Sequence, residues 1–206
     1  MPTPTYDSYI QPPAGTNERR LSVKVVSTLE DFAKVIAIRA ATYMSEQRCP
    51  YDEEFDGNDF CGAQFLGFVG GEPAGCLRAR FFAGFAKLER LAVRSEFRKT
   101  RLAFRMVRAG IDFARKKGFT TLYGHAQERL ESFWSHFGAR PLGRRRDLVF
   151  SDFRYTEMRL DLPPDPDAIT MESDPYVIVR PEGRWHCRGV LEVSSVRPVT
   201  SPLASR

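Results

Sequence analysis

The chain has 206 residues, of which 42% are hydrophobic and 28% charged, and its formal net charge is +5. This length predicts one domain that buries a core without help from disulfides or a metal. No apolar run is long enough to span a bilayer, and the first twenty residues lack the apolar run of a signal peptide. The four cysteines have neither CxxC nor metal-ligand spacing, so we expect reduced thiols in a cytoplasmic protein.

The periodic patterns predict an alternating order of strands and helices. Residues 1–20, rich in Pro, Thr and Gly, predict a flexible N-terminal arm, and Thr28 is a candidate N-cap. In chain order, we expect strands over 21–26, 64–69, 74–82, 86–94, 119–123, 143–150 and 153–160. Helical patterns run over 32–43, 98–117 and 127–137, and the stretch 45–61 predicts an irregular acidic loop. This order predicts a mixed α/β sheet with helices on its faces.

A proline-rich break at 163–166 divides the chain. We therefore expect an N-terminal arm over 1–20, a domain over 21–162 and a C-terminal extension of unassigned role over 163–206. The extension contains two candidate strands, at 176–180 and 186–193.

The most informative segment is the strand at 86–94, which leads through a basic turn directly into a helix. The first amides of a helix lack internal partners, and with the helix dipole they form an anion site suited to a diphosphate. Arg98, Lys99 and Arg101 add full charges there. A solvated helix face and a nucleic-acid surface are the alternatives, but the chain has no helix-turn-helix, zinc or aromatic-basic motif for nucleic acid.

The sequence from Arg98 to Ala103 resembles the acyl-CoA-binding motif of the GNAT superfamily, Arg/Gln-x-x-Gly-x-Gly/Ala. Residues 114–119 resemble the family's helix end, and Ala126-Gln127 followed by 133–141 resembles its second signature. The resemblance covers roughly residues 23–162. It implies a mixed, mostly antiparallel central sheet that is flanked by helices and splayed at the acyl-CoA site.

The resemblance also implies an N-acyltransferase that uses acetyl-CoA or another acyl-CoA and no metal, with direct attack by an amine. The acceptor would be a small-molecule or peptide amine, and a homodimer is one arrangement that the family allows. Backbone groups of Leu91 and Val93 would pair with the pantetheine arm. The implied acyl-CoA site comprises Leu91, Ala92, Val93, Arg98, Lys99, Thr100, Arg101, Leu102, Ala103 and Gln127.

Two residues depart from the family pattern. Arg101 stands where the family usually has Gly, and Trp134 stands where many members have the Tyr that protonates the leaving thiolate. An indole donates a hydrogen bond but supplies no proton, so the thiolate leaves unaided or water serves. Together these departures leave open a GNAT-fold binding module without catalysis.

Glu89 is the first candidate for the general base. Strict alternation would place it on the same face as Leu91 and Val93, with Arg90 on the opposite face. An exposed strand glutamate is the alternative. His125 is the second candidate base, and His136 is expected at the surface.

Arg39, Arg78 and the acidic pattern Glu54-x-Asp56-x-x-Asp59 resemble acyl-homoserine-lactone synthases and N-acyl amino acid synthases. The resemblance implies an ion network that joins the two arginines to these carboxylates. It also implies an alternative acyl donor, an acyl carrier protein docked on the basic helix. A solvated loop, or a surface for a cationic acceptor, are the other interpretations of the carboxylates.

Overall fold

The computed structural model describes residues 20–143 and 147–201, so the predictions for residues 1–19 and 144–146 lie outside it. Its centre is a sheet in the order β1-β2-β3-β4-β5-β8-β6, with β7 also paired to β8. The strands are β1 (Leu21–Val25), β2 (Gly62–Val69), β3 (Glu72–Phe82), β4 (Phe85–Val93), β5 (Thr121–Gln127), β6 (Arg140–Pro141), β7 (Leu148–Phe150) and β8 (Phe153–Asp161). Every pairing is antiparallel except β4 with β5. The predicted mixed, mostly antiparallel sheet is confirmed.

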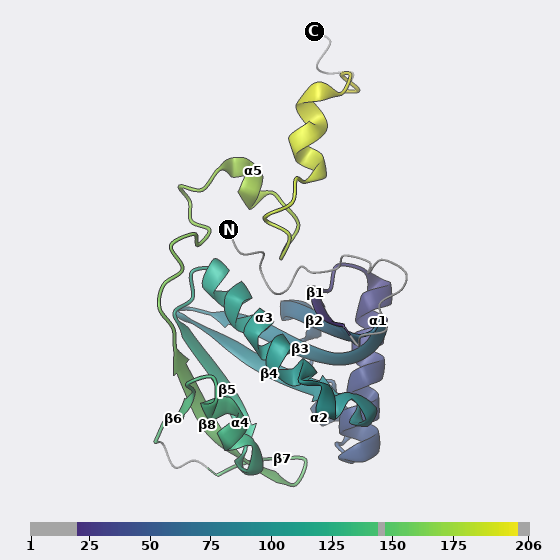
Figure 1. The fold of residues 1–206 in the computed structure, drawn as a ribbon, viewed down its shortest axis with the longest axis vertical. Coiled ribbons are helices and arrows are strands. Elements are labelled where there is room, and N and C mark those ends of the chain that lie inside the picture. The colour runs from purple at the N-terminus through teal and green to yellow at the C-terminus, as the bar shows by residue number, and fades with distance from the viewer. Residues whose placement is uncertain (1–19, 144–146, 202–206) are drawn as a thin grey trace.

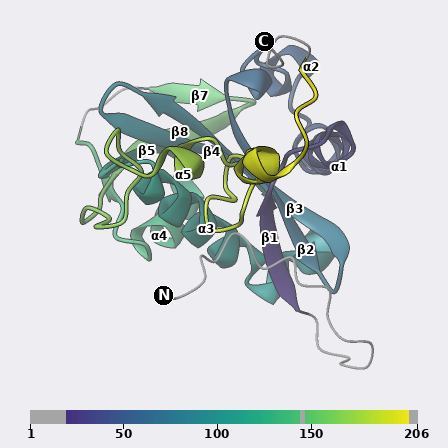
Figure 2. The ribbon, with the colours of Figure 1, turned by 90° about the horizontal axis from the view of Figure 1, so that it is seen from above.

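Helices α1 (Leu29–Arg39) and α3 (Leu102–Lys116) cover opposite faces of this sheet (Figures 1 and 2). The helical segments are α1 (Leu29–Arg39), the π-helical η1 (Ala40–Glu46), α2 (Tyr51–Glu54), η2 (Asp59–Cys61), η3 (Ser95–Thr100), α3 (Leu102–Lys116), η4 (Glu128–Leu130) and α4 (Glu131–Ser135). The larger core lies under α3 and includes Met106 and Phe113, and a smaller core under α1 includes Val35 and Leu66. The predicted cap is confirmed, because the Thr28 hydroxyl accepts the Asp31 amide at 3.2 Å.

β4 and β5 pair only at Ala86–Leu122 and Lys87–Tyr123, and then diverge (Figure 1). The register between β3 and β4 also shifts near this point, where Arg90 has a φ of 53°. A bulge inserts one unpaired residue and re-aims the side chains beyond it. The bulge and the parting of the strands together make the sheet splay.

The bulge makes the expected alternation along β4 wrong. Glu89 and Arg90 both reach the polar cluster under α1, since Glu89 binds Arg78 and Arg90 binds Asp56. Leu91 packs instead against the core under α3. Glu89 and Leu91 therefore occupy opposite faces, and Arg90 shares the face of Glu89.

The helix after β4 starts later than its pattern predicts. Residues 95–100 form the 3₁₀ segment η3, Arg101 is left-handed with a φ of 63°, and α3 begins at Leu102. The predicted end of this helical pattern at residue 117 is confirmed, because α3 ends at Lys116 and Gly118 has a left-handed φ of 84°. The acidic stretch 45–61, expected to be irregular, contains α2 and η2.

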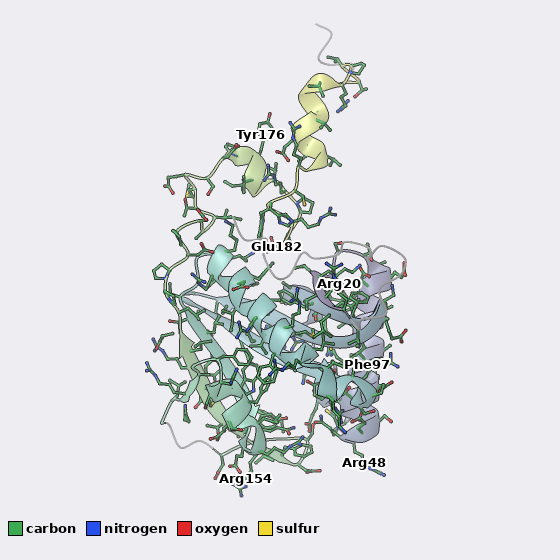
Figure 3. The ribbon with its side chains drawn as sticks, in the orientation of Figure 1. Arg20, Arg48, Phe97, Arg154, Tyr176 and Glu182 are labelled. Carbon is green, nitrogen blue, oxygen red and sulfur yellow. The ribbon has the colours of Figure 1, made fainter. Side chains whose placement is uncertain are left out.

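The C-terminal extension contains α5 (Pro175–Ile178) and the 3₁₀ segment η5 (Val190–Val196), so the strands predicted there are wrong. The Asp174 carboxylate accepts the Tyr176 amide at 2.9 Å and caps α5. Trp185 is buried against Phe113, with ring centroids 5.1 Å apart. Glu182, labelled in Figure 3, forms an ion pair with the lysine that follows α3, while η5 stands away from the sheet (Figure 1). The extension is thus anchored at the C-terminal end of α3.

Candidate functional site

The divergence of β4 from β5 opens into a cavity of about 400 Å³. Its floor is formed by β4 and β5, and other walls come from η1 and α2, from α4, and from the β7–β8 hairpin. The lining side chains are mostly aromatic or charged. They include Tyr43, Glu53, Asp56, Lys87, Glu89, Arg90, His125, Gln127, Arg129, Phe133, Trp134, Phe150 and Tyr155. Aromatic walls with a few polar groups are typical of small-molecule sites.

Backbone groups of β4 face this opening at two positions. The Arg94 amide donates to Ala74 of β3 at 2.9 Å, so alternation turns the groups of Leu91 and Val93 away from β3. The Leu91 carbonyl accepts the Tyr43 hydroxyl at 2.7 Å, and the Val93 carbonyl accepts Nε of Arg98 at 3.1 Å. Each carbonyl keeps a second lone pair. Ala92 instead pairs with β3 and is buried under α1.

The start of α3 lies beside the end of β4. Arg98, Lys99 and Arg101 are exposed there, and the first helical bond joins the Arg105 amide to the Arg101 carbonyl. The amides of residues 102–104 therefore precede the helical bonding pattern and are suited to an anion. Arg98 is also an ion-pair partner of Glu46, so its guanidinium ties the turn to the end of η1.

The remaining residues predicted for this turn, Thr100, Leu102 and Ala103, have different environments. Thr100 turns its hydroxyl back to the Phe97 carbonyl at 2.6 Å. Leu102 is buried in the core under α3, and Ala103 packs partly against it. These side chains shape the turn, and its charged side chains face solvent.

The ion network implied by the synthase resemblance is confirmed. Arg39 and Arg78 have no exposed side-chain surface. Arg39 contacts Glu54 at 2.5 Å and also pairs with Asp59. Arg78 contacts Asp56 at 2.6 Å, Asp59 at 2.8 Å and Glu89 at 2.8 Å. We call these six residues the buried ion network.

The network keeps Asp56 ionised. Burial alone would raise the pKa of Asp56, but the hydrogen bonds and charge of Arg78, with help from Arg90, hold that pKa well below its usual value. The network fixes α2 and η2 against β3 and β4, and so forms one side of the cavity.

Glu89, Trp134 and Gln127 all line the cavity. The two oxygens of Glu89 are held by Nε of Arg78 at 2.8 Å and by Nζ of Lys87 at 2.7 Å. Gln127 donates to the Tyr155 hydroxyl at 3.1 Å. Trp134 also borders a second, apolar cavity of about 20 Å³, which shares Leu88 with the first.

His125 lines the cavity, and its imidazole contacts Tyr123 of the same strand. Its Nε2 is 2.7 Å from the Tyr123 hydroxyl, which donates to Glu157 at 2.7 Å. Burial and the neighbouring Lys87 lower the pKa of His125, although Glu157 opposes this. The unprotonated imidazole is therefore favoured near neutral pH.

Several cavity residues were missed by sequence reasoning. Tyr43 and Tyr155 line the cavity, and Ser151 joins the β7–β8 turn to Glu53, with both its amide and its hydroxyl 2.8 Å from one carboxylate oxygen. The alternation of Tyr123, His125 and Gln127 along one strand was the available signal for a shared face. The contact of Ser151 with Glu53 spans 98 residues and had no local signal.

Two further observations bear on the site. In the described part of the chain, no group of three His, Cys, Asp or Glu side chains is arranged to hold a metal ion. Among the same residues, no helix has the length and apolar character needed to cross a membrane.

Comparisons with known proteins identify the family. Residues 32–139 match the family described as Acetyltransferase (GNAT) family. A Bacillus subtilis (strain 168) protein provisionally named an acetyltransferase is 28% identical over 123 residues, which cover 58% of this chain and 84% of that protein.

Two solved structures share the fold. An acyl-CoA N-acyltransferase from Pseudomonas aeruginosa has a TM-score of 0.60 and 19% identity, covering 68% of this chain and 99% of that one. FeeM, an N-acyl amino acid synthase from uncultured soil microbes, has a TM-score of 0.59 and 15% identity, covering 72% and 94%. With more than half of its length matched by the family profile, the chain belongs to the GNAT acetyltransferase family.

Proposed function

We propose that the protein transfers a short acyl group, acetyl in the first instance, from acyl-CoA to an amine of a small molecule or peptide. The observation that carries this proposal is the opening between β4 and β5. Pairing ends at Lys87 and Tyr123, and backbone groups of Leu91 and Val93 face the gap. The basic start of α3 adjoins the same strand end. This arrangement suits a pantetheine arm along β4 with its diphosphate at the helix start.

The apolar cavity beside Trp134 supports a short acyl group. It measures about 20 Å³, and a cavity of roughly 10–15 Å³ is about one water-sized sphere. An acetyl methyl group fits this space, whereas a longer chain requires Trp134 or its neighbours to move. Trp134 would thus limit the acyl length.

The chemistry requires mainly positioning. The amine nitrogen forms a bond to the thioester carbonyl carbon while the carbon–sulfur bond breaks, and the electron pair leaves with sulfur. The Leu91 amide, turned toward the gap, would donate to the carbonyl oxygen as that oxygen gains charge. The thiolate needs little help to leave, because thiols have a pKa of about 8.5. Tyr155 lies in the same cavity, where its hydroxyl oxygen accepts from Gln127 and its proton would serve where Trp134 can supply none.

Thermal unfolding with CoA, acetyl-CoA, butyryl-CoA and decanoyl-CoA tests the donor. We expect the largest stabilisation with acetyl-CoA, because a ligand that binds the native state raises its melting temperature. Trp134→Ala should move the preference toward longer chains, and His136→Ala, on the exposed end of α4, is the matched control. No shift with any CoA thioester would overturn the proposed donor.

A carrier-protein donor is the second candidate, favoured by the buried ion network that resembles the N-acyl amino acid synthases. The acidic carrier would dock on basic residues of α3 such as Arg105 and Arg108. Stabilisation by an acylated carrier protein, with none from the four CoA ligands, would replace the first proposal with this one. Binding of acetyl-CoA without CoA release across an amine panel would indicate a non-catalytic module.

A further inference from the structure

Three polar side chains on β5 and β8 form a hydrogen-bonded chain that ends in the cavity between β4 and β5. Nε2 of His125 and Oε1 of Glu157 each lie 2.7 Å from the Tyr123 hydroxyl. Glu157 is paired directly with His125 in the strand register, so both side chains lie on one face of the sheet. Of the three, only His125 lines the cavity of about 400 Å³ between β4 and β5, whereas Tyr123 and Glu157 line a separate cavity of about 590 Å³.

The hydrogen bonds of Tyr123 favour one tautomer of His125. A carboxylate only accepts, and a phenol has one proton to donate. If Tyr123 donates to Glu157, its oxygen must accept from a protonated Nε2 of His125. Nδ1 is then the ring nitrogen that carries the free lone pair. The second oxygen of Glu157 is buried and has no hydrogen-bond partner within the described residues, so Tyr123 is its carboxylate's principal donor.

We propose that His125 is the catalytic base of the acyl transfer, with Tyr123 and Glu157 as positioning residues. This inference rests on the proposed function and names its proton acceptor. As the amine nitrogen bonds to the thioester carbon, Nδ1 receives the proton that the nitrogen loses, and the sulfur leaves as thiolate. The imidazolium then returns its proton to the thiolate or to water, so no other reactant is needed.

The surroundings of His125 favour this role over the expected role of Glu89. The charged groups that face the imidazole are Lys87 and Glu89 from β4 and Glu157 from β8. Burial and Lys87 lower the pKa of His125, so its basic form is present near neutral pH. Both oxygens of Glu89 are instead engaged by Arg78 and Lys87.

The positioning is tested without turnover by nitrogen-15 NMR of the histidines in the full chain. The sequence has three histidines, so His125→Gln identifies the resonance of interest. We expect the Nε2–H tautomer in the native protein and a mixture of tautomers in Tyr123→Phe. An Nδ1–H tautomer in the native protein would overturn the proposed arrangement.

The catalytic role is tested by CoA release from acetyl-CoA with 2-phenylethylamine, spermidine and an alanyl peptide as acceptors. General base catalysis contributes about 10²–10⁴-fold, so we expect His125→Gln to lower kcat at least about 100-fold, with little change in acetyl-CoA affinity. His136→Gln, with an exposed imidazole outside the cavity, is the matched control.

The pH profile separates positioning from a general structural effect. Glu157 raises the pKa of His125 and Lys87 lowers it. The acidic limb of kcat should therefore move to lower pH in Glu157→Gln and to higher pH in Lys87→Gln. A merely structural role would lower the rate without these opposite shifts.

The outcomes distinguish this inference from the proposed function. If the native protein releases CoA and His125→Gln does so equally fast with the same pH profile, the base role alone is overturned. If the native protein binds acetyl-CoA but releases no CoA with any of the three acceptors, transfer to amines is overturned, and the base role with it.

Discussion

Two regions of the protein that contain arginines differ in their surroundings. In the buried ion network, Arg39 and Arg78 have no exposed side-chain surface, and carboxylates surround them. At the start of α3, Arg98, Lys99 and Arg101 are exposed, and Arg98 pairs with Glu46 while 47% of its own side chain stays exposed. The first region neutralises its charges internally, and the second leaves positive charge available to a ligand.

The comparison shows that the role of an arginine depends on whether nearby carboxylates already pair with its guanidinium. A buried arginine that loses its partners costs several kcal/mol, so it holds structure in place. An exposed arginine contributes little to stability and can bind phosphate instead. Substitution in the buried ion network should therefore lower mainly the stability of the protein. Substitution at the start of α3 should lower mainly its affinity for the ligand.

The largest effect is expected from Arg78→Ala. Its removal leaves carboxylates of the network buried without their cation, so the free energy of unfolding should fall by about 3–5 kcal/mol. Urea denaturation measures this. Arg80→Ala, on the same strand but 3.8 Å from Glu89 and partly exposed, is the matched control and should cost about 1 kcal/mol or less. Equal losses in the two variants would contradict the structural role of the network.

Asp56→Asn should weaken the same network by about 2 kcal/mol at pH 7, because it removes a charged acceptor of Arg78. The pKa of Asp56 is lowered in the folded protein, so its contribution is present above the unfolded pKa of about 3.9 and is lost as pH falls further. The stability difference between the native protein and this variant should therefore shrink below about pH 4. A difference that is independent of pH would contradict this assignment.

Arg98→Ala should act mainly on affinity. Loss of a charged contact near the diphosphate, and of the tie to Glu46, should weaken CoA binding about 10-fold. The free energy of unfolding should change by about 1 kcal/mol or less. Calorimetric titration with CoA measures the first, and Arg108→Ala, on the exposed face of α3, is the control. Unchanged affinity would count against the anion site at this turn.

The smallest effect is expected at Arg101, which has a left-handed backbone. A left-handed residue other than Gly carries a penalty of about 1–2 kcal/mol. Arg101→Gly should therefore be about 1 kcal/mol more stable than Arg101→Ala in urea denaturation, since both lose the side chain and only Gly relieves the backbone. Equal stability of the two variants would show that the turn changes conformation on substitution.

Local patterns predicted most of the order of elements between residues 21 and 161, but not α2, η2 or β6. Thr28 before α1 and Gly118 after α3 act through their immediate neighbours, and both lie where the helical patterns require them. The strands predicted in the C-terminal extension are wrong because strand formation depends on more than the local pattern. Its β-branched residues favour strands, but strands need a partner, and η5 lies away from the sheet (Figure 1).

The site was predictable only in part. The partners of Arg39 and Arg78 followed from a family resemblance, and the basic turn followed from charge beside a helix start. The bulge at Arg90 depends on the register with β3, which no local pattern reveals. The contact of Tyr123 with Glu157 joins residues 34 apart in the sequence, so only the folded sheet brings them together.

The two tryptophans of the chain lie in different parts of the molecule, and this makes the protein a natural optical reporter. Trp134 borders two cavities, whereas Trp185 belongs to the C-terminal extension and is buried against Phe113 of α3. Replacing Trp185 with phenylalanine leaves Trp134 as the single indole, and we expect its emission to respond when a ligand occupies the cavity. Replacing Trp134 with phenylalanine instead leaves only Trp185, whose emission should report detachment of the C-terminal extension. Ligand binding and docking of the extension can then be followed separately in the same protein.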